Sequence, residues 1–201
     1  MAITVPPIKR KRITLRIEGE SPLQMHKWSE KAITMMREKQ AGKKTKTRDA
    51  RNPEAECEAA TYRMPDGTPA IPGMAVKRAI ITAAHKDIGI EKTLVRKAIF
   101  LEIDDPNGYI PLSGYSEPWM REDQMRVGMG TTDLRYRPQF EQWGAVITFE
   151  VDGELLTDDD LIRLIDRAGF GVGILEGRPE KGRDFGRFRV DTEFEVTVVT
   201  L

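Results

Sequence analysis

The segment from residue 169 to residue 187 combines the residue types that bind phosphate groups. Its glycines and basic side chains are Gly169, Gly171, Gly173, Gly177, Gly182, Gly186, Arg178, Lys181, Arg183 and Arg187. Glycine lets main-chain N–H groups approach a phosphate without obstruction by a Cβ atom, and the cations add favourable charge. The segment therefore predicts contacts to the backbone of a nucleic acid. The alternative is a turn that only reverses the chain after a helix.

Three further segments are rich in basic side chains, and two of them also carry aromatic rings. Single-strand-binding surfaces use this mixture, because cations hold phosphates while rings stack on bases. The predicted contact residues in these segments are His26, Lys27, Trp28, Lys43, Lys44, Lys46, Arg48, Arg126, Arg135 and Arg137. The alternatives are a buried Trp28 that anchors the fold, with His26 on the surface, and a solvated charge run in the segment that holds Lys43 to Arg48.

The residues that could support catalysis are few. One cysteine and two histidines, His26 and His85, do not make up a usual zinc site, and no nucleophile motif is present. The run Asp158–Asp160 is better explained by stabilisation of a helix N-terminus than by metal binding. We therefore predict no catalytic residue, no metal and no cofactor.

Composition limits the class of protein. The chain has 201 residues, of which 39% are hydrophobic, a length that favours a single domain. With one cysteine, no signal-peptide-like start and no long apolar run, we expect a cytoplasmic protein without a membrane partner. Net charge is zero, yet residues 1–50 carry +8 and residues 151–201 carry −5. This asymmetry suggests a basic groove, or head-to-tail contacts between copies.

Hydrophobic periodicity predicts the elements of the first half. Alternation predicts strands at 12–18 and 97–103, and the pattern of MAVKRAIITAAHK predicts a helix at 73–87. A short helix is expected between Trp28 and Lys39, and the polar residues 40–64 predict a loop insertion.

The second half repeats the same order. We predict a strand at 144–151, a helix at 158–168 that ends at Gly169, and a last strand at 187–199. Residues 104–142, rich in glycine, proline and aromatics, form a second insertion with room for a hairpin. The order βαββαβ indicates an α+β, ferredoxin-like (RRM-like) core with an antiparallel sheet and both helices on one face.

Two motifs resemble the repeat-associated mysterious protein (RAMP) superfamily, which supplies the backbone subunits of CRISPR effector complexes. Ala70-Ile71-Pro72-Gly73, running on to Lys77, is similar to the family's entry to the first helix. Residues 169–188 are similar to its glycine-rich loop before the final strand. The resemblance implies one RAMP-like domain over 1–201, with its core at 12–18, 71–103 and 143–201. It also implies that Lys77 contacts nucleic acid and that 104–142 acts as a thumb.

The resemblance implies a non-enzymatic RNA-binding subunit that oligomerises head to tail along a single strand or joins other effector subunits. One alternative is a virus-encoded protein that binds or anneals single-stranded DNA. Another is a RAMP-type endoribonuclease, for which Asp49 in the basic loop is the candidate catalytic residue. RNA is favoured over DNA as the partner.

Overall fold

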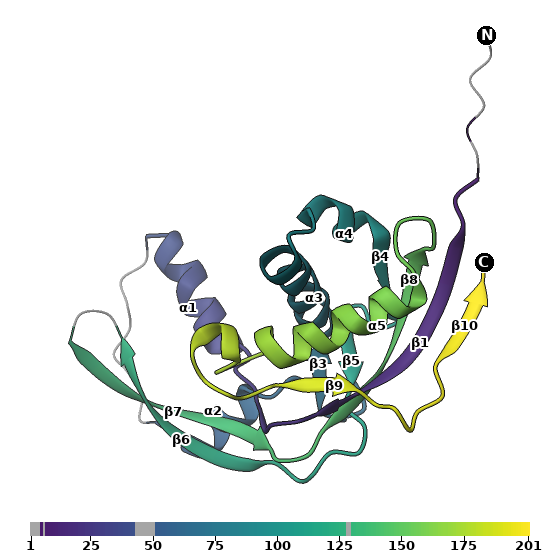
Figure 1. Cartoon of the computed structure of the whole chain (residues 1–201). Helices are drawn as coiled ribbons and strands as arrows, with labels where there is room; N and C mark the ends of the chain where they lie inside the picture. Colours follow the sequence, from purple (N-terminus) through teal and green to yellow (C-terminus); the bar gives the residue numbers. More distant parts are fainter. Residues whose placement is uncertain (1–4, 6, 43–50, 128–129) are drawn as a thin grey trace.

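The centre of the molecule is an antiparallel sheet (Figure 1). The computed structural model describes residues 5, 7–42, 51–127 and 130–201. The strands β10 (Thr197–Thr200), β1 (Arg10–Gly19), β8 (Gly144–Asp152) and β4 (Ile99–Glu102) lie in that order, and β9 (Phe188–Val190) pairs with the far end of β1. Every pairing in this sheet is antiparallel. The chain is therefore an α+β protein with an antiparallel sheet, as predicted.

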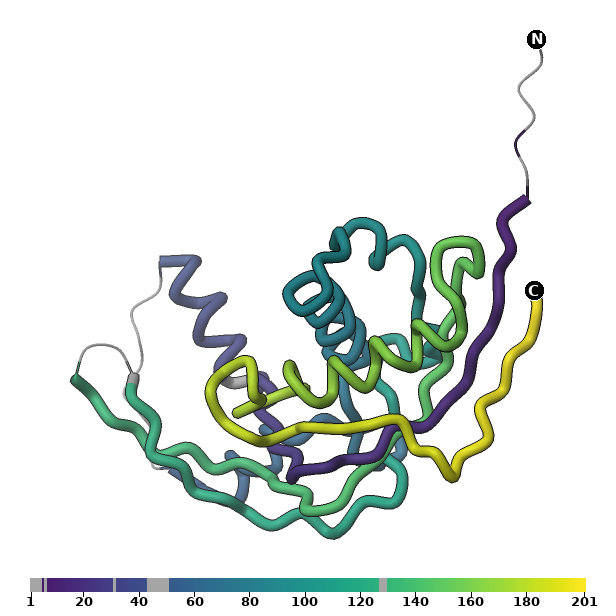
Figure 2. Tube along the Cα trace, viewed as in Figure 1, coloured from purple at the N-terminus to yellow at the C-terminus, as the bar shows by residue number. Residues whose placement is uncertain are grey.

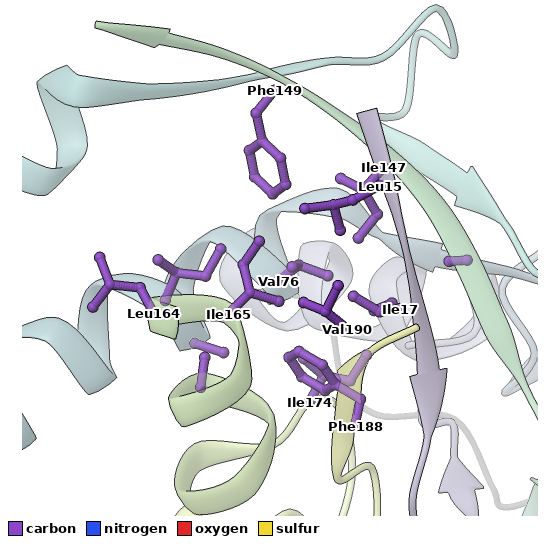
Figure 3. Close-up of a cluster of buried hydrophobic side chains, with 14 of the residues drawn as sticks. Leu15, Ile17, Val76, Ile147, Phe149, Leu164, Ile165, Ile174, Phe188 and Val190 are labelled. Carbon is purple, nitrogen blue, oxygen red and sulfur yellow. The ribbon is translucent and has the colours of Figure 1, made fainter. Parts of the chain in front are cut away.

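Two helices cover one face of this sheet and enclose the core (Figure 3). Val76 of α3 (Gly73–Ile88) and Ile165 of α5 (Asp158–Arg167) meet Leu15 and Phe149 from the sheet, and all four side chains are fully buried. Alternation along β1 and β8 places their apolar side chains on this face, because neighbouring strand residues point in opposite directions. Among the described residues, no helix has both the length and the hydrophobicity needed to cross a bilayer.

The opposite face of the sheet is covered by ion pairs between strands. Arg12 Nε lies 2.6 Å from Glu102, and Arg10 Nη1 lies 3.1 Å from Glu150. Arg16 pairs with a buried Asp191. Cations from the beginning of the chain are thus neutralised by carboxylates from later strands, so this face is not an open cationic platform.

The insertion predicted at 104–142 contains a hairpin. β6 (Trp119–Val127) and β7 (Thr131–Phe140) pair along their whole length, and β2 (Leu23–Gln24) adds a short third strand. Figure 2 shows the two long strands reaching away from the main sheet. A separate two-stranded sheet joins β3 (Ala70–Pro72) to β5 (Tyr109–Pro111).

The predicted loop insertion at 40–64 is wrong over part of its length. The helix α1 (Glu30–Gln40) enters it, and α2 (Pro53–Ala59) lies inside it. Asn52 accepts a hydrogen bond from the Ala55 N–H, and Pro53 occupies the first helical turn, where a missing N–H costs nothing. These start signals outweigh the polar composition that indicated a loop.

The end of the chain also differs from the prediction. The helix α5 does not stop at Gly169 but continues as a π-helical turn, η1 (Ala168–Val172), which ends at Gly173 with φ +66°. A Cβ atom at Gly169 would lie 1.8 Å from the Phe188 carbonyl oxygen, so this glycine allows the turn to pack against β9. The predicted strand at 187–199 is two strands, separated by residues 191–196.

Two further elements complete the chain. A helix, α4 (Lys92–Ala98), precedes β4, where the sequence predicted the strand to begin at residue 97. A short 3-10 turn, η2 (Pro179–Lys181), interrupts the glycine-rich segment. Both elements contribute side chains to the candidate site.

Candidate nucleic-acid interface

A groove of about 960 Å³ lies between α3, α4 and the glycine-rich segment. Segments that are far apart in the sequence meet here, since residues of α3 lie beside residues 172–180 and beside His26 and Tyr62. Five of the side chains that line the groove are cationic and two are acidic: Lys77, Arg78, Lys92, Arg96, Arg178, Glu176 and Glu180. The groove is therefore basic although the chain as a whole is neutral.

Three of these cations have no acidic partner among the residues that the structure describes. Arg78, Lys92 and Arg96 are exposed, and no carboxylate lies within 4 Å of their charged groups in the described ranges. Lys92 and Arg96 are four residues apart in α4, so they share one face of that helix. We name this set the unpaired cations. Charged groups without a local partner are available to an external phosphate.

Apolar side chains lie beside these cations in the groove. Met74 is 49% exposed, and Ala75 and Ile81 of the same helix also contribute. Tyr62 stands edge-on to Tyr109 with ring centroids 5.5 Å apart, and burial raises the pKa of Tyr62. A surface that combines free cations with apolar and aromatic groups matches both parts of a nucleotide, the phosphate and the base.

Lys77 has a mainly structural position. Its Nζ atom donates to the Ile99 carbonyl oxygen at 2.6 Å and lies 4.7 Å from the centre of the Phe100 ring. Burial lowers the pKa of this lysine. Lys77 therefore fastens α3 to β4, and its neighbour Arg78 presents the free charge to the groove.

The glycine-rich segment forms the other wall, and its polar groups are largely engaged within the protein. Arg178 lies 3.0 Å from Glu180 and donates to the Leu175 carbonyl oxygen. The N–H groups of Ile174 and Gly186 donate to carbonyl oxygens of Gly186 and Pro22. A phosphate cradle made of free N–H groups is therefore not formed at these positions.

Most of the glycines serve close packing. Gly186 has φ +66°, and a Cβ atom there would lie 2.1 Å from the Ile174 carbonyl oxygen. A Cβ atom at Gly173 would meet Pro179 at 2.6 Å, and one at Gly177 would meet Phe185 at 2.8 Å. Only the surroundings of Gly171 and Gly182 have room for a side chain within this segment. Tight packing thus explains the composition that predicted phosphate binding.

A buried polar cluster joins this segment to the middle of the hairpin. Asp123 is 6% exposed, and it accepts hydrogen bonds from Arg121 at 3.0 Å and Gln24 at 3.1 Å. Arg137 and Arg183 each lie 3.5 Å from it. Burial alone would raise the pKa of Asp123, but these hydrogen bonds and the charges of Arg121 and Arg183 hold that pKa below its ordinary value.

Arg137 extends the same cluster towards the groove. It was predicted to contact nucleic acid, yet it is only 3% exposed and lies 3.3 Å from Glu176. His26 Nδ1 is 3.6 Å from Glu176 and 3.4 Å from Arg137 Nη2. The His26 ring, followed by the charge of Arg137, lowers the pKa of Glu176 against the effect of burial. Arg137 therefore supports the wall of the groove from behind.

Replacing Asp123 by Asn tests this cluster. We expect the variant to lose about 3 kcal/mol of unfolding free energy at pH 7, because three guanidinium groups are left near a buried neutral side chain. A carboxylate with a lowered pKa stabilises the fold above its ordinary pKa, and this stabilisation disappears as the pH falls through the folded-state pKa. The difference between parent and variant in urea unfolding should thus be constant from pH 7 to about pH 5 and should vanish progressively below about pH 4.

The matched control for this test is Asp184→Asn, since Asp184 is an exposed aspartate of the glycine-rich segment and has no ion pair in the described part of the chain. Its unfolding free energy should stay within about 0.5 kcal/mol of the parent at every pH. Equal losses in the two variants at pH 7 would show that the buried cluster does not stabilise the hairpin.

The remaining predicted contact residues are dispersed. Arg187 pairs with Glu20 and lies over the Phe170 ring, and Arg135 pairs with Asp133. Arg126, Lys181 and Trp28 are exposed outside the groove, and Lys27 lies 6.0 Å from the centre of the Tyr109 ring. Residues Lys43, Lys44, Lys46, Arg48 and Asp49 lie outside the described ranges. Of the predicted residues, the groove brings together His26, Lys77, Gly173 and Arg178.

The three unpaired cations were missed by the site prediction. Arg78 directly follows Lys77, and the spacing of Lys92 and Arg96 already places them on one side of a helix. The spacing of four residues would have identified the pair if a helix had been predicted there. The helix α4 was not predicted, so the two residues were not recognised as neighbours.

No protein-family model matches this chain, and no curated protein matches it. Among the described residues, no three His, Cys, Asp or Glu side chains are grouped so that they could hold a metal ion. The geometry of the groove is therefore the main basis for a functional proposal.

Proposed function

We propose that this protein is a non-enzymatic binder of single-stranded nucleic acid and that the groove beside α3 holds the strand. The observation that carries the proposal is the set of unpaired cations, Arg78, Lys92 and Arg96, beside apolar lining in one groove. Phosphates contribute most of the affinity in such a site, and they carry no base information, so binding should depend on salt and little on sequence.

We also propose that the core is ferredoxin-like and that the chain is a RAMP-type backbone subunit. The strand order β10-β1-β8-β4 agrees with that arrangement, because the first core strand lies between the last core strand, β10, and the third core strand, β8. The hairpin of β6 and β7 lies in the insertion 104–142, which we propose acts as the thumb. The preference for RNA and the association with other effector subunits rest on the two motifs alone.

The charge asymmetry along the chain no longer favours the proposed head-to-tail oligomer. Lys9 lies 3.5 Å from Glu154 and Lys11 lies 2.9 Å from Asp158, so the basic start and the acidic end of the chain neutralise each other within one molecule. Fewer opposite charges are therefore left for contacts between copies. The proposal of a head-to-tail oligomer now depends on the two sequence motifs.

The test is a comparison of oligouridylate, oligothymidylate and duplex RNA, each 20 nucleotides long, with the protein freed of co-purifying nucleic acid. We expect the single-stranded RNA to bind more tightly than the duplex, with a log–log salt slope of about −2, as three phosphate contacts at roughly 0.7 each would give. Oligoadenylate should bind within about tenfold of oligouridylate, because phosphates dominate.

Tighter binding of oligothymidylate than of oligouridylate would favour the virus-encoded DNA-binding alternative. Shortening of the RNA during incubation would favour the endoribonuclease alternative. Equal, salt-independent binding of all probes, or none at 50 mM salt, would sink the proposal.

A further inference from the structure

One edge of the main sheet is left uncovered by the residues that the structure describes. Within those residues β10 is the outermost strand, and its one strand partner is β1 (Figure 1). All four of its residues are exposed, and Val198 and Val199 are 44% and 45% exposed. An edge strand offers a row of N–H and C=O groups to another strand, and most proteins guard such an edge with charge, proline or a bulge. The strand Thr-Val-Val-Thr contains no charge and no proline.

The register of β10 shows which of its main-chain groups face outwards. The Leu201 N–H donates to the Arg10 carbonyl oxygen at 2.9 Å, so that N–H points towards β1. Main-chain groups alternate in direction along a strand, and therefore Thr197 and Val199 also bond inwards. The N–H and C=O groups of Val198 and Thr200 point away from the sheet.

The opposite edge of the sheet is guarded. On β4, the Lys77 ammonium group occupies the Ile99 carbonyl oxygen at 2.6 Å. Glu102 at the end of the same strand carries charge and pairs with Arg12. A neighbouring copy that approached β4 would therefore meet an occupied carbonyl oxygen and a charged side chain, and neither obstacle is present on β10.

We propose that two copies of this chain associate by antiparallel pairing of β10 with β10. A two-fold axis at Val199 brings Val198 of each copy opposite Thr200 of the other, and the four outward N–H groups then meet four carbonyl oxygens. The two Val199 side chains face each other across the axis in a close, non-hydrogen-bonded pair. The strand can pair with a copy of itself because its outward N–H and C=O groups belong to Val198 and Thr200, which lie at equal distances from the axis at Val199.

A second copy is the occupant that the chemistry favours. Antiparallel self-pairing puts identical residues opposite each other at the axis, which is unfavourable when they are charged and favourable when they are β-branched. The residues at this axis are valines without charge. The inference does not depend on nucleic-acid binding, and the two surfaces lie on different elements, since the groove is built on α3, α4 and residues 172–180.

The test is the mass of the nucleic-acid-free protein measured by sedimentation over the range from 1 to 200 µM. We expect a reversible dimer, twice the chain mass of 22.8 kDa, with a dissociation constant of tens of micromolar. Val199→Lys places two ammonium groups opposite each other and should raise that constant at least tenfold. Val198→Pro, which removes an outward N–H and spares the bonds to β1, should have a similar effect.

The matched control is Val146→Lys, the same substitution on β8 in the middle of the sheet, at a side chain that is 40% exposed. It should dimerise as the parent does, and unchanged thermal melting would show that all variants fold. A parent that stays monomeric to 200 µM overturns the inference. So does a dimer that Val199→Lys and Val146→Lys affect equally.

Discussion

Replacing Arg78, Lys92 and Arg96 together by Gln is expected to weaken oligouridylate binding about 100-fold at 100 mM salt. Each of these cations has no acidic partner in the described part of the chain, so removing it loses a phosphate contact without freeing a carboxylate. Three contacts of about 1 kcal/mol each correspond to roughly that ratio. The salt slope should fall towards zero, by about 0.7 for each lost contact. The measurement is fluorescence anisotropy at four salt concentrations.

The control is a triple variant with the same composition of charges, Arg37, Lys97 and Arg163 to Gln. These side chains are exposed, do not line the groove and have no ion pair among the described residues. It should lose less than fivefold in affinity, since only the overall charge has changed. Similar losses in both triple variants would mean that the groove is not the site and that binding follows net charge.

Replacing Gly186 by Ala is expected to reduce the free energy of unfolding by about 3–4 kcal/mol. The residue has φ +66°, which costs a non-glycine residue about 1–2 kcal/mol, and its new Cβ atom would lie 2.1 Å from the Ile174 carbonyl oxygen. Movement of the backbone to relieve that contact adds about 2 kcal/mol. The measurement is urea unfolding followed by circular dichroism.

Gly182→Ala is the matched control for this variant. Gly182 has a similar φ of +80°, but nothing would lie within 4 Å of a Cβ atom at this position, so only the conformational cost of about 1 kcal/mol remains. Nucleic-acid binding by Gly182→Ala should equal that of the parent. If the two variants unfold at the same urea concentration, the glycine-rich segment is a loose loop and not a packed wall.

The main sheet was predictable because burial alternates along its strands. Ile13, Leu15 and Ile17 are fully buried, as their spacing of two residues indicated. The last strand was harder, since Val198 continues the same alternation and yet is 44% exposed on β10. Parity predicts which side chains share a face, but only the tertiary structure determines whether a helix covers that part of the face.

The site was less predictable, because the charge of a residue does not reveal its partner. Arg137, Arg183 and Arg187 read as free cations in the sequence, and each has a carboxylate partner that is at least 39 residues away along the chain. The motif indicated Lys77 as the contact residue. Consecutive residues point about 100° apart around a helix, so Lys77 bonds to β4 while Arg78 faces the groove. The local sequence pattern predicts which face of an element a side chain occupies. Its ion-pair partner depends on residues far away in the chain.

The central position of β1 affects how the protein folds during its synthesis. The strand β1 finds its neighbours at residues 144–152, 188–190 and 197–200, all of which are synthesised after it. While the ribosome is still making the middle of the chain, Ile13, Leu15 and Ile17 have no sheet to join. A nascent chain with such distant contacts folds late and exposes an apolar strand meanwhile. Slow translation of residues 144–200 would therefore lengthen the period in which this apolar strand is exposed.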